Sequence, residues 1–521
     1  MSGRINNLVD ISQSPAALRG RADIVLENAK WASHVFQRFD REATMRVVDA
    51  VARTAHDGAA RYAELAVEES GFGVVAHKRI KNEMTAMPLV DYYRDDDYVN
   101  PRISENLKIV EIPRPAGVVF ALTPSTNPIS TLNYKIVLAM MTRNAIVISP
   151  HPAVRHCCVE AANSLAAAAT AAGAPASSIQ VLAEPSIPLV NEFMRSPKTS
   201  VILATGGSAM VRAAYASSNP AIGVGPGNAP VFVDSSADFE KAAARIVESK
   251  SFDNSVLCTN ESVLITVPEA DSRLRRALGS RGGHLCSDEE TGLLRRFLFH
   301  ASGFNVEAIG RDASWIANQA GIRVPRSAKI LIAPIARIGV EEDLSREKLC
   351  PVLAYHVAKN RTQAISQSRA VLRLAGAGHT AAVHASDEQT AFDFARAVES
   401  YRVVVNAPCS QGAAGFGTNL APTFTVGTGY FGRSSVGDNI GPQHLVHWTK
   451  LAYNSDRSEK FGDFRGVAAR FDGPLPQAPE DGVPGRTRND SPPGGGIAQS
   501  GIDREELRRI IAEELRAVLK G

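Results

Sequence analysis

Cys258 is the residue of this sequence whose neighbours best suit a chemical reaction. It lies in the run Ser251-Phe-Asp-Asn-Ser-Val-Leu-Cys-Thr-Asn-Glu261, just after an alanine-rich segment that predicts a helix ending near Lys250. A thiol on a turn among small polar residues is placed to be exposed and reactive, and a thiolate is a natural nucleophile for a carbonyl carbon. The pattern therefore predicts covalent catalysis by Cys258.

The other five cysteines lack an activating neighbourhood. Free cysteine is among the most buried residue types and is usually inert, so we interpret these residues as structural. Six cysteines without paired spacing are typical of a reducing compartment, and the lack of a CxxC pattern gives no indication of zinc. The five structural cysteines are Cys157, Cys158, Cys286, Cys350 and Cys409.

Three further segments place glycine, proline and short polar residues at the ends of predicted strands. Pro124-Ser-Thr-Asn-Pro128 follows a strand ending at Leu122, and Gly223-Val-Gly-Pro-Gly-Asn-Ala-Pro230 precedes a strand at 231–233. Ala204-Thr-Gly-Gly-Ser-Ala-Met-Val211 follows a strand and opens a helix, so its backbone amides could face a pyrophosphate. Plain turn chemistry also produces such segments, and the last one lacks the G-x-G-x-x-G fingerprint.

Taken in this order, the motifs resemble the acylating, coenzyme A-dependent branch of the aldehyde dehydrogenase superfamily. The resemblance extends to about Lys450 and includes Gly427-Thr-Gly-Tyr-Phe-Gly-Arg-Ser-Ser-Val-Gly-Asp-Asn439. It implies an α/β protein with two doubly wound domains. It also implies that Cys258 adds to a short-chain aldehyde, that hydride transfer to NAD leaves a thioester, and that coenzyme A takes up the acyl group.

The resemblance nominates partners for Cys258. An oxyanion needs preorganised hydrogen-bond donors. The register of the loop at 124–128 places Thr126 at the donor position, whereas amide chemistry favours Asn127, so both stay open; the backbone N–H of Cys258 would be the second donor. Val224 stands where hydrolysing relatives carry a glutamate base, so hydrolysis should be slow and acyl transfer to coenzyme A should be favoured.

Cofactor contacts follow from the same resemblance. Ser149 replaces the lysine that hydrolysing relatives place on the adenosine ribose, and the nearby His151 is interpreted as a turn residue. Glu347, in the segment 346–352, matches the glutamate that holds the nicotinamide ribose. The full predicted set is Ser125, Ser149, Gly206, Gly207, Ser208, Gly225, Gly227 and Glu347, with no metal ligand.

Departures from the family pattern bear on the substrate. Ser255 stands where many relatives have glycine before the nucleophile, and Tyr430 and Arg433 lie in a glycine-rich segment on the substrate side. The sequence leaves the aldehyde and the choice between NAD and NADP open. Two other functions also stay open: a coenzyme A-independent dehydrogenase, and a cargo or scaffold protein with a vestigial site.

The elements that must position these residues alternate along the chain. The 521 residues carry a net charge of +3 without a long basic run, which disfavours a nucleic-acid partner. No apolar stretch has membrane-spanning length, and no signal peptide is recognised. Helices are predicted over 17–90, and short apolar strands then alternate with helices, which favours parallel sheets. The predicted strands are 107–112, 118–122, 145–148, 179–182, 201–203, 231–233, 262–266, 329–332, 352–355 and 380–383.

These elements predict three structural regions. By resemblance, the arm at 103–115 and the late strand at 444–450 should pair between the subunits of a homodimer or homotetramer. The predicted boundaries are 1–102 and 117–230 for a cofactor-binding domain, 103–116 and 440–455 for an oligomerisation arm, and 231–439 for a catalytic domain.

The C-terminal part differs in composition from the rest. Half of the residues in 473–496 are proline or glycine, so 472–500 is predicted to be a flexible linker. The segment 501–521 predicts an amphipathic helix, and linker plus helix resemble the encapsulation peptides of bacterial microcompartments. The residues 502–519 would then bind a shell protein or co-cargo inside such a compartment in the cytoplasm. A helix that folds back on its own domain is the alternative, while mixed acidic and basic residues disfavour a membrane surface.

Overall fold

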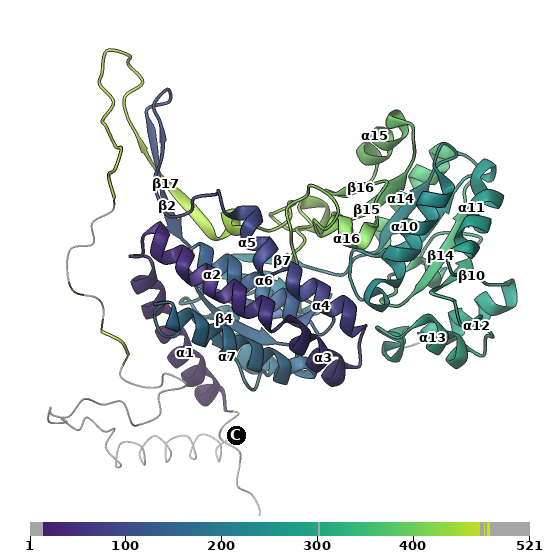
Figure 1. Cartoon of the computed structure of the whole chain (residues 1–521), viewed down its shortest axis with the longest axis horizontal. Helices are drawn as coiled ribbons and strands as arrows, with labels where there is room; N and C mark the ends of the chain where they lie inside the picture. The colour runs from purple at the N-terminus through teal and green to yellow at the C-terminus, as the bar shows by residue number, and fades with distance from the viewer. Residues whose placement is uncertain (1–13, 301–302, 469–473, 475–476, 480–521) are drawn as a thin grey trace, which may run out of the picture. The chain divides into compact units, whose positions relative to one another are not determined.

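The computed structural model describes residues 14–300, 303–468, 474 and 477–479. The helix predicted at 501–521 and most of the linker predicted at 472–500 lie outside these residues. The described chain is built on two parallel β-sheets with helices packed on them, together with a three-stranded antiparallel arm (Figure 1). The α/β fold class predicted from the alternating pattern is confirmed.

The first sheet forms because its strands are apolar on both faces. In β3, Phe120 and Leu122 belong to a core cluster shared with two helices, α1 and α8, whereas Val119 and Ala121 belong to a second cluster shared with α6 and α7. Successive strand side chains point to opposite faces, so a strand covered on both sides reads as one apolar run. The strand order is β5-β4-β3-β6-β7, with bounds β3 Val118–Thr123, β4 Ala145–Pro150, β5 Ile179–Val181, β6 Val201–Thr205 and β7 Ala221–Val224.

Helices that accompany the first sheet begin at capping residues. The side chain of Ser14 accepts from the amide of Ala17 at the start of α1, and Asp40 accepts from the amide of Ala43 at the start of α2. The helices are α1 Pro15–Phe36, α2 Arg41–Asp57, α3 Ala59–Ser70, α4 Val75–Met84, α5 Met87–Tyr93, α6 Pro128–Met141, α7 Arg155–Ala171, α8 Ile187–Arg195 and α9 Ser208–Tyr215.

The second sheet has seven parallel strands in the order β10-β13-β14-β9-β8-β15-β16. Its strands are β8 Ala229–Val233, β9 Glu261–Thr266, β10 Gly283–Leu285, β13 Ile330–Pro334, β14 Val352–Val357, β15 Ala381–His384 and β16 Val403–Val405. Its helices are α10 Phe239–Ser251, α11 Pro268–Ser280, α12 Asp288–Leu298, α13 Ala313–Ala320, α14 Arg361–Leu374, α15 Glu388–Ala397 and α16 Cys409–Ala413; a short hairpin joins β11 Phe299–His300 to β12 Gly303–Phe304.

The strand orders determine where loops from distant parts of the sequence can meet. In the first sheet the chain runs outwards from β3 to β5 and then returns to β6 on the other side of β3. The carboxyl ends of β3 and β6 therefore flank a topological switch point, where open α/β sheets bind ligands. In the second sheet β8, β9 and β14 are parallel neighbours, so the segments that precede them emerge at one edge.

The arm consists of β1 (Arg102–Ser104), β2 (Ile109–Pro115) and β17 (Val446–Ala452). The strands β2 and β17 pair along their whole length, from Val446 opposite Pro115 to Ala452 opposite Ile109 (Figure 1). The two strands pair within one chain, whereas the sequence predicts pairing between subunits. The long separation in sequence hid this pairing, and pairing with a second copy stays a prediction.

The strand β7 and the start of the helix α6 were not among the elements predicted from the sequence. Ala221–Val224 forms β7, although its glycine-containing sequence was treated only as a motif. The helix α6 begins at Pro128, which is the last residue of the 124–128 segment, because proline suits the first helical position. Within the part of the chain that the structure describes, no helix has the length and apolar character needed to cross a bilayer.

Candidate active site

A cavity of about 350 Å³ lies where the ends of the two sheets meet. Loops after β3, β6 and β7 form one wall, and the segments before β9 and β14 form the other. Eight of the eleven predicted site residues line it: Ser125, Thr126, Asn127, Gly206, Gly207, Gly225, Cys258 and Glu347. The strand topology thus brings together motifs that are far apart in the sequence.

Three predicted cofactor residues lie outside the lining of the cavity. Ser149 is buried in β4, opposite Leu122 of β3. Ser208 is the exposed first residue of α9, directly after the Gly206–Gly207 pair. Gly227 lies behind the cavity wall, where its amide donates a hydrogen bond of 3.0 Å to Oε1 of Glu347.

Cys258 lies on the predicted turn between α10 and β9, and the backbone before it is strained. Asp253, Asn254 and Ser255 have φ values of 49°, 50° and 65°, in the left-handed region. That conformation costs an L-residue other than glycine roughly 1–2 kcal/mol. Ser255, which replaces the glycine of many relatives, therefore occupies a position suited to glycine, and its buried hydroxyl makes no hydrogen bond.

The environment of the thiol corrects the expectation of an exposed, activated cysteine. Cys258 is half-buried at the cavity, and burial together with the Glu347 carboxylate raises its pKa to about 12. Arg402 and Lys81 act in the opposite direction, because their positive charges favour the thiolate. The sequence motif predicts Cys258 as the nucleophile, but it could not reveal the desolvation that raises the pKa of its thiol.

The other five cysteines are buried, as the structural interpretation expected. His151 also behaves as a turn residue, since its Nδ1 accepts from the amide of Ala153 at 3.2 Å, although its ring reaches the cavity. Burial lowers the pKa of His151.

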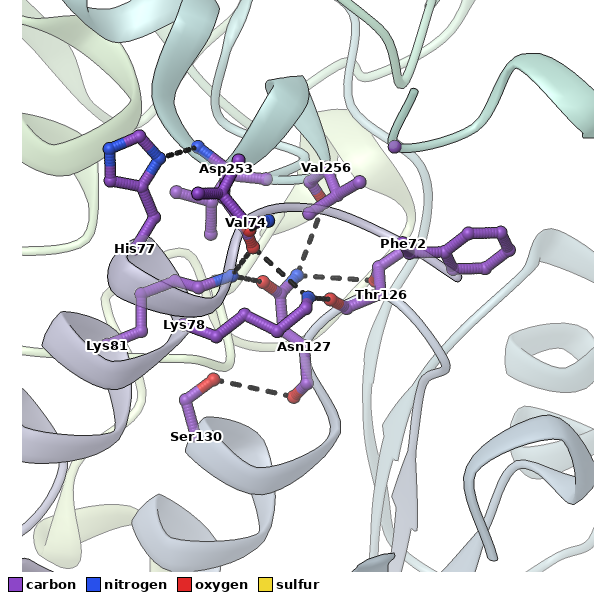
Figure 2. A network of polar contacts seen from close by, with 12 residues as sticks. Phe72, Val74, His77, Lys78, Lys81, Thr126, Asn127, Ser130, Asp253 and Val256 are labelled. Carbon is purple, nitrogen blue, oxygen red and sulfur yellow. Dashed lines mark hydrogen bonds and ion pairs between the residues drawn. The ribbon is translucent and has the colours of Figure 1, made fainter. Parts of the chain in front are cut away.

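Asn127 is held more firmly than Thr126, the other residue considered as an oxyanion donor. Its Oδ1 accepts a hydrogen bond of 2.5 Å from Nζ of Lys81, and its Nδ2 donates to the carbonyl of Val256 at 3.3 Å (Figure 2). The Thr126 hydroxyl accepts from the same Nδ2 at 3.2 Å. The Asn127 amide is therefore tied to the segment that carries the nucleophile.

Glu347 lies in a loop before β14, and it is the one carboxylate among the described residues that line the cavity. Burial raises its pKa to about 8, while the amide of Gly227 and the nearby Lys250 and Lys348 oppose the rise. Val224 ends β7 and lines the cavity with an apolar side chain.

The glycine residues of the cavity differ in how much space surrounds them. A Cβ added at Gly206, Gly207 or Gly225 would meet no atom within 4 Å. A Cβ added at Gly227 would instead overlap the carbonyl oxygen of Cys258. The open backbone beside the switch point fits a phosphate-bearing ligand such as a dinucleotide, whose pyrophosphate needs close access to amides.

A group of buried charges next to the cavity escaped sequence reasoning. Lys78 and Lys81 of α4 both contact the carboxylate of Asp253, which belongs to the left-handed turn before Cys258 (Figure 2). The spacing of three residues that puts both lysines on one helix face is visible in the sequence. Their burial is not visible there, because charged residues at such spacing are usually solvated.

A third buried lysine, Lys250, holds the other side of the turn that carries Cys258. Lys250, at the end of α10, donates to Oδ1 of Asn260 at 2.6 Å. The amide of Asn260 in turn donates to the carbonyls of Ser255, at 2.8 Å, and Leu257. Burial lowers the pKa of Lys250 to about 8. The Cys258 turn is therefore hydrogen-bonded from both sides by buried side chains.

Comparisons with known proteins identify the family of this chain. The sequence profile of the aldehyde dehydrogenase family matches residues 8–281. The bifunctional aldehyde-alcohol dehydrogenase of Escherichia coli K12 is 34% identical over 438 residues, which cover 83% of this chain and 49% of that protein. The chain thus spans about half the length of the aldehyde-alcohol dehydrogenases that it matches.

Two solved structures that this chain resembles are also aldehyde dehydrogenases. A crystal structure of an acetylating aldehyde dehydrogenase from Geobacillus thermoglucosidasius superimposes with a TM-score of 0.83 at 34% identity, covering 86% of this chain and 99% of that one. A propionaldehyde dehydrogenase from Rhodopseudomonas palustris, solved with bound CoA and an acylated cysteine, gives a TM-score of 0.76 at 28% identity, covering 83% of this chain and 97% of that one.

Proposed function

The chain belongs to the acylating branch of the aldehyde dehydrogenase family, and we propose that it oxidises a short-chain aldehyde to its acyl-CoA with reduction of NAD. The observation that carries this proposal is the cavity in which Cys258 faces Glu347 and an apolar Val224. That set supplies a nucleophile for the aldehyde and lacks the glutamate that hydrolysing relatives use.

Cys258 would attack the aldehyde carbon after losing its proton, to give a thiohemiacetal. Arg402 and Lys81 help at this step because they favour the thiolate. A nicotinamide bound between Glu347 and the open glycine residues would accept the hydride, which leaves a thioester on Cys258. We assign the cofactor contacts to Ser125, Gly206, Gly207, Gly225 and Glu347, because these residues line the cavity.

The Asn127 amide is proposed as the side-chain donor to the oxyanion. Its position is fixed by hydrogen bonds to Lys81 and to the carbonyl of Val256, two residues before the nucleophile. A donor that is held in place before the reaction stabilises developing charge without reorganisation. Thr126 is the second choice: its hydroxyl accepts from the Asn127 amide and keeps its own proton to donate, but no buried charged side chain among the described residues fixes its direction as Lys81 fixes that of Asn127.

Release of the acyl group is proposed to require coenzyme A. Water needs a base to attack a thioester, and Val224 supplies none. The coenzyme A thiol is closer to its deprotonated form at neutral pH and needs less assistance. Coenzyme A would reach the thioester through the same cavity, and the aldehyde, coenzyme A and NAD are the proposed small-molecule partners.

The test is NADH formation from acetaldehyde, propionaldehyde and larger aldehydes, with and without coenzyme A. We expect turnover that depends on coenzyme A and that falls at least about 10³-fold in Cys258→Ala, since removal of a covalent nucleophile leaves only binding effects. Cys409→Ala is the matched control, because that cysteine is buried away from the cavity. Equal turnover without coenzyme A would contradict acyl transfer.

A coenzyme A-independent dehydrogenase is the second candidate, and one observation favours it. Glu347 has a pKa of about 8 and lines the same cavity as Cys258, so it could accept a proton from water. In that case Glu347→Gln would abolish the turnover measured without coenzyme A. Release of the free acid rather than the thioester would identify this reaction.

We further propose that the protein is microcompartment cargo, targeted through residues 502–519, and that the arm supports a homodimer or homotetramer. The apolar stripe of the predicted C-terminal helix supports the first proposal, since such a stripe needs a partner to bury it. Leu507→Glu together with Leu515→Glu should abolish co-purification with shell proteins without loss of turnover. Light scattering of the full chain would give the subunit number.

A further inference from the structure

The buried charge cluster behind Cys258 contains two lysines and one carboxylate. Lys81, which is 1% exposed, donates to Oδ2 of Asp253 and to Oδ1 of Asn127. Lys78, one turn earlier on α4, donates to the same Oδ2 at 3.2 Å and to the carbonyl of Thr126 at 2.9 Å (Figure 2). The cluster therefore joins α4 both to the predicted oxyanion loop and to the turn before the nucleophile.

Asp253 is the point at which α4 holds that turn. Its Oδ1 accepts from the amide of Val74 at 2.6 Å, and its own amide donates to Nδ1 of His77 at 2.9 Å. Burial alone would raise the pKa of Asp253, but Lys81 and Lys78 outweigh burial and leave it lowered. A carboxylate kept ionised and bonded on both oxygens can hold its residue in the left-handed conformation.

Lys81 also decides which way the Asn127 amide points. An ammonium group can only donate hydrogen bonds, so Oδ1 of Asn127 must face it. The NH₂ end then donates to the carbonyl of Val256 at 3.3 Å and to the Thr126 hydroxyl at 3.2 Å, and an oxyanion would replace one of these two bonds. Without Lys81, only these two longer hydrogen bonds would hold the amide, and the donor would be less firmly preorganised.

We propose that Lys81 is a positioning residue for the reaction proposed above: it orients the Asn127 amide as the oxyanion donor, and through Asp253 it holds the turn that presents Cys258. The cluster also carries one excess positive charge, because two ammonium groups face one carboxylate. That charge lies near the thiol and favours its ionised form. Only the orientation of the donor depends on the proposed reaction; the effect on the thiol does not.

The charges that face Cys258 come from four elements. Glu347, from the loop before β14, disfavours the thiolate, whereas Arg402, just before β16, favours it together with Lys81. Lys78 and Asp253 complete the cluster, and His77 is kept neutral near pH 7 because burial lowers its pKa. Loss of Lys81 leaves the Glu347 charge less opposed, so the Cys258 pKa should rise further.

The first measurement is the rate at which iodoacetamide alkylates Cys258 in the full chain between pH 7 and 9.5. Below the pKa, the rate is proportional to the thiolate fraction, so it falls about tenfold for each unit by which the pKa rises. Near pH 7 we expect about a tenfold decrease in Lys81→Met and a smaller decrease in Lys81→Arg, which keeps the charge. The decrease in Lys81→Met should shrink above about pH 8, because burial lowers the pKa of Lys81 itself to about 8. Cys258→Ala gives the background from the other cysteines, and Lys241→Met, an exposed lysine of α10, is the matched control.

A double variant separates charge from positioning and protects against misfolding. Lys81→Met with Asp253→Asn keeps one excess positive charge, on Lys78, and leaves no unpaired carboxylate. Its alkylation rate should return to within about threefold of that of the wild type, since the thiolate responds to the net charge. Its turnover should stay low, because the Asn127 amide has lost its orienting donor. Recovery of both rates would overturn the positioning role.

The second measurement is turnover with coenzyme A in a double-mutant cycle. Loss of an oxyanion donor typically lowers kcat about 10²–10³-fold, so we expect that effect in Asn127→Ala. Lys81→Met combined with Asp253→Asn, which keeps the net charge near the thiol, should lower kcat about tenfold with little change in the KM for aldehyde, and it should add little in the Asn127→Ala background. Additive losses, or an alkylation profile that Lys81→Met leaves unchanged, would overturn the inference. A wild-type chain without turnover would contradict the proposed reaction, and the alkylation profile would still decide the role of Lys81.

Discussion

The two walls of the cavity are built in opposite ways. The wall from the first sheet presents bare backbone: Gly206, Gly207 and Gly225 have no atom near the position of a Cβ. The wall from the second sheet is crowded, with Gly227 pressed against the carbonyl of Cys258 and three left-handed residues before the thiol. The first wall thus leaves room for a ligand, and the second is fixed before any ligand arrives.

This difference fits the proposed functions of the two walls, which are cofactor binding for the first and presentation of the nucleophile for the second. A phosphate-binding wall works through amides, and side chains would only obstruct it. A nucleophile must be held within a fraction of an ångström of its reactive position, so its turn is secured by buried side chains on both sides. The strain of that turn is balanced by the ion pairs of Asp253 and by the hydrogen bonds of Asn260.

The largest effect is expected on the crowded wall. Gly227→Ala would push the added methyl group into the carbonyl of Cys258 and displace the nucleophile. A displacement of about 1 Å can lower a rate about 10²-fold, so we expect a loss of that size in kcat. Steady-state kinetics measure it, and Gly279→Ala, where the methyl group meets no atom within 4 Å, is the control. An unchanged kcat would show that the turn can move freely.

The next effect concerns the charge that the crowded wall places beside the thiol. Glu347 has a pKa of about 8, so it is mostly neutral below pH 8 and negative above it. Glu347→Gln should therefore leave the alkylation of Cys258 unchanged near pH 6.5 and accelerate it up to about tenfold above pH 8, where repulsion of the thiolate is removed. A ratio that does not change with pH would refute this coupling.

A smaller effect is expected on the open wall. Gly207→Ala adds a methyl group where no protein atom lies within 4 Å, at a backbone conformation that alanine tolerates. Stability should change by less than about 0.5 kcal/mol. The KM for NAD should rise a few-fold, because the methyl group occupies space that the cofactor needs. If KM and kcat both stay at wild-type values, the pyrophosphate does not bind at this loop.

The smallest effect is expected from relief of strain. Ser255→Gly removes a left-handed serine with a buried hydroxyl that lacks a hydrogen bond. The gain is partly offset by the greater entropy of glycine in the unfolded chain, so the free energy of unfolding should rise by about 0.5–1 kcal/mol. Denaturant titration would measure it, with Ser255→Ala as the comparison. A decrease in stability would mean that the serine side chain contributes packing.

Local sequence patterns predicted much of the fold and of the candidate site. Alternating apolar runs predicted both parallel sheets, because a strand buried on both faces needs apolar residues throughout. The motif around Cys258 predicts the nucleophile, and the motif at Val224 predicts that a carboxylate base is missing. Each of these features depends on residues that are close together in the sequence, so one stretch of chain contains the whole signal.

Tertiary structure decided the rest. Lys81 meets Asn127 and Asp253 across 46 and 172 residues, and β2 meets β17 across most of the chain. Asn127 stands out over Thr126 only because a buried ammonium group fixes its amide. The pKa of Cys258 likewise depends on burial and on charges brought by folding. The sequence alone predicted that Cys258 reacts, whereas long-range packing and desolvation set how that residue is held and how readily it ionises.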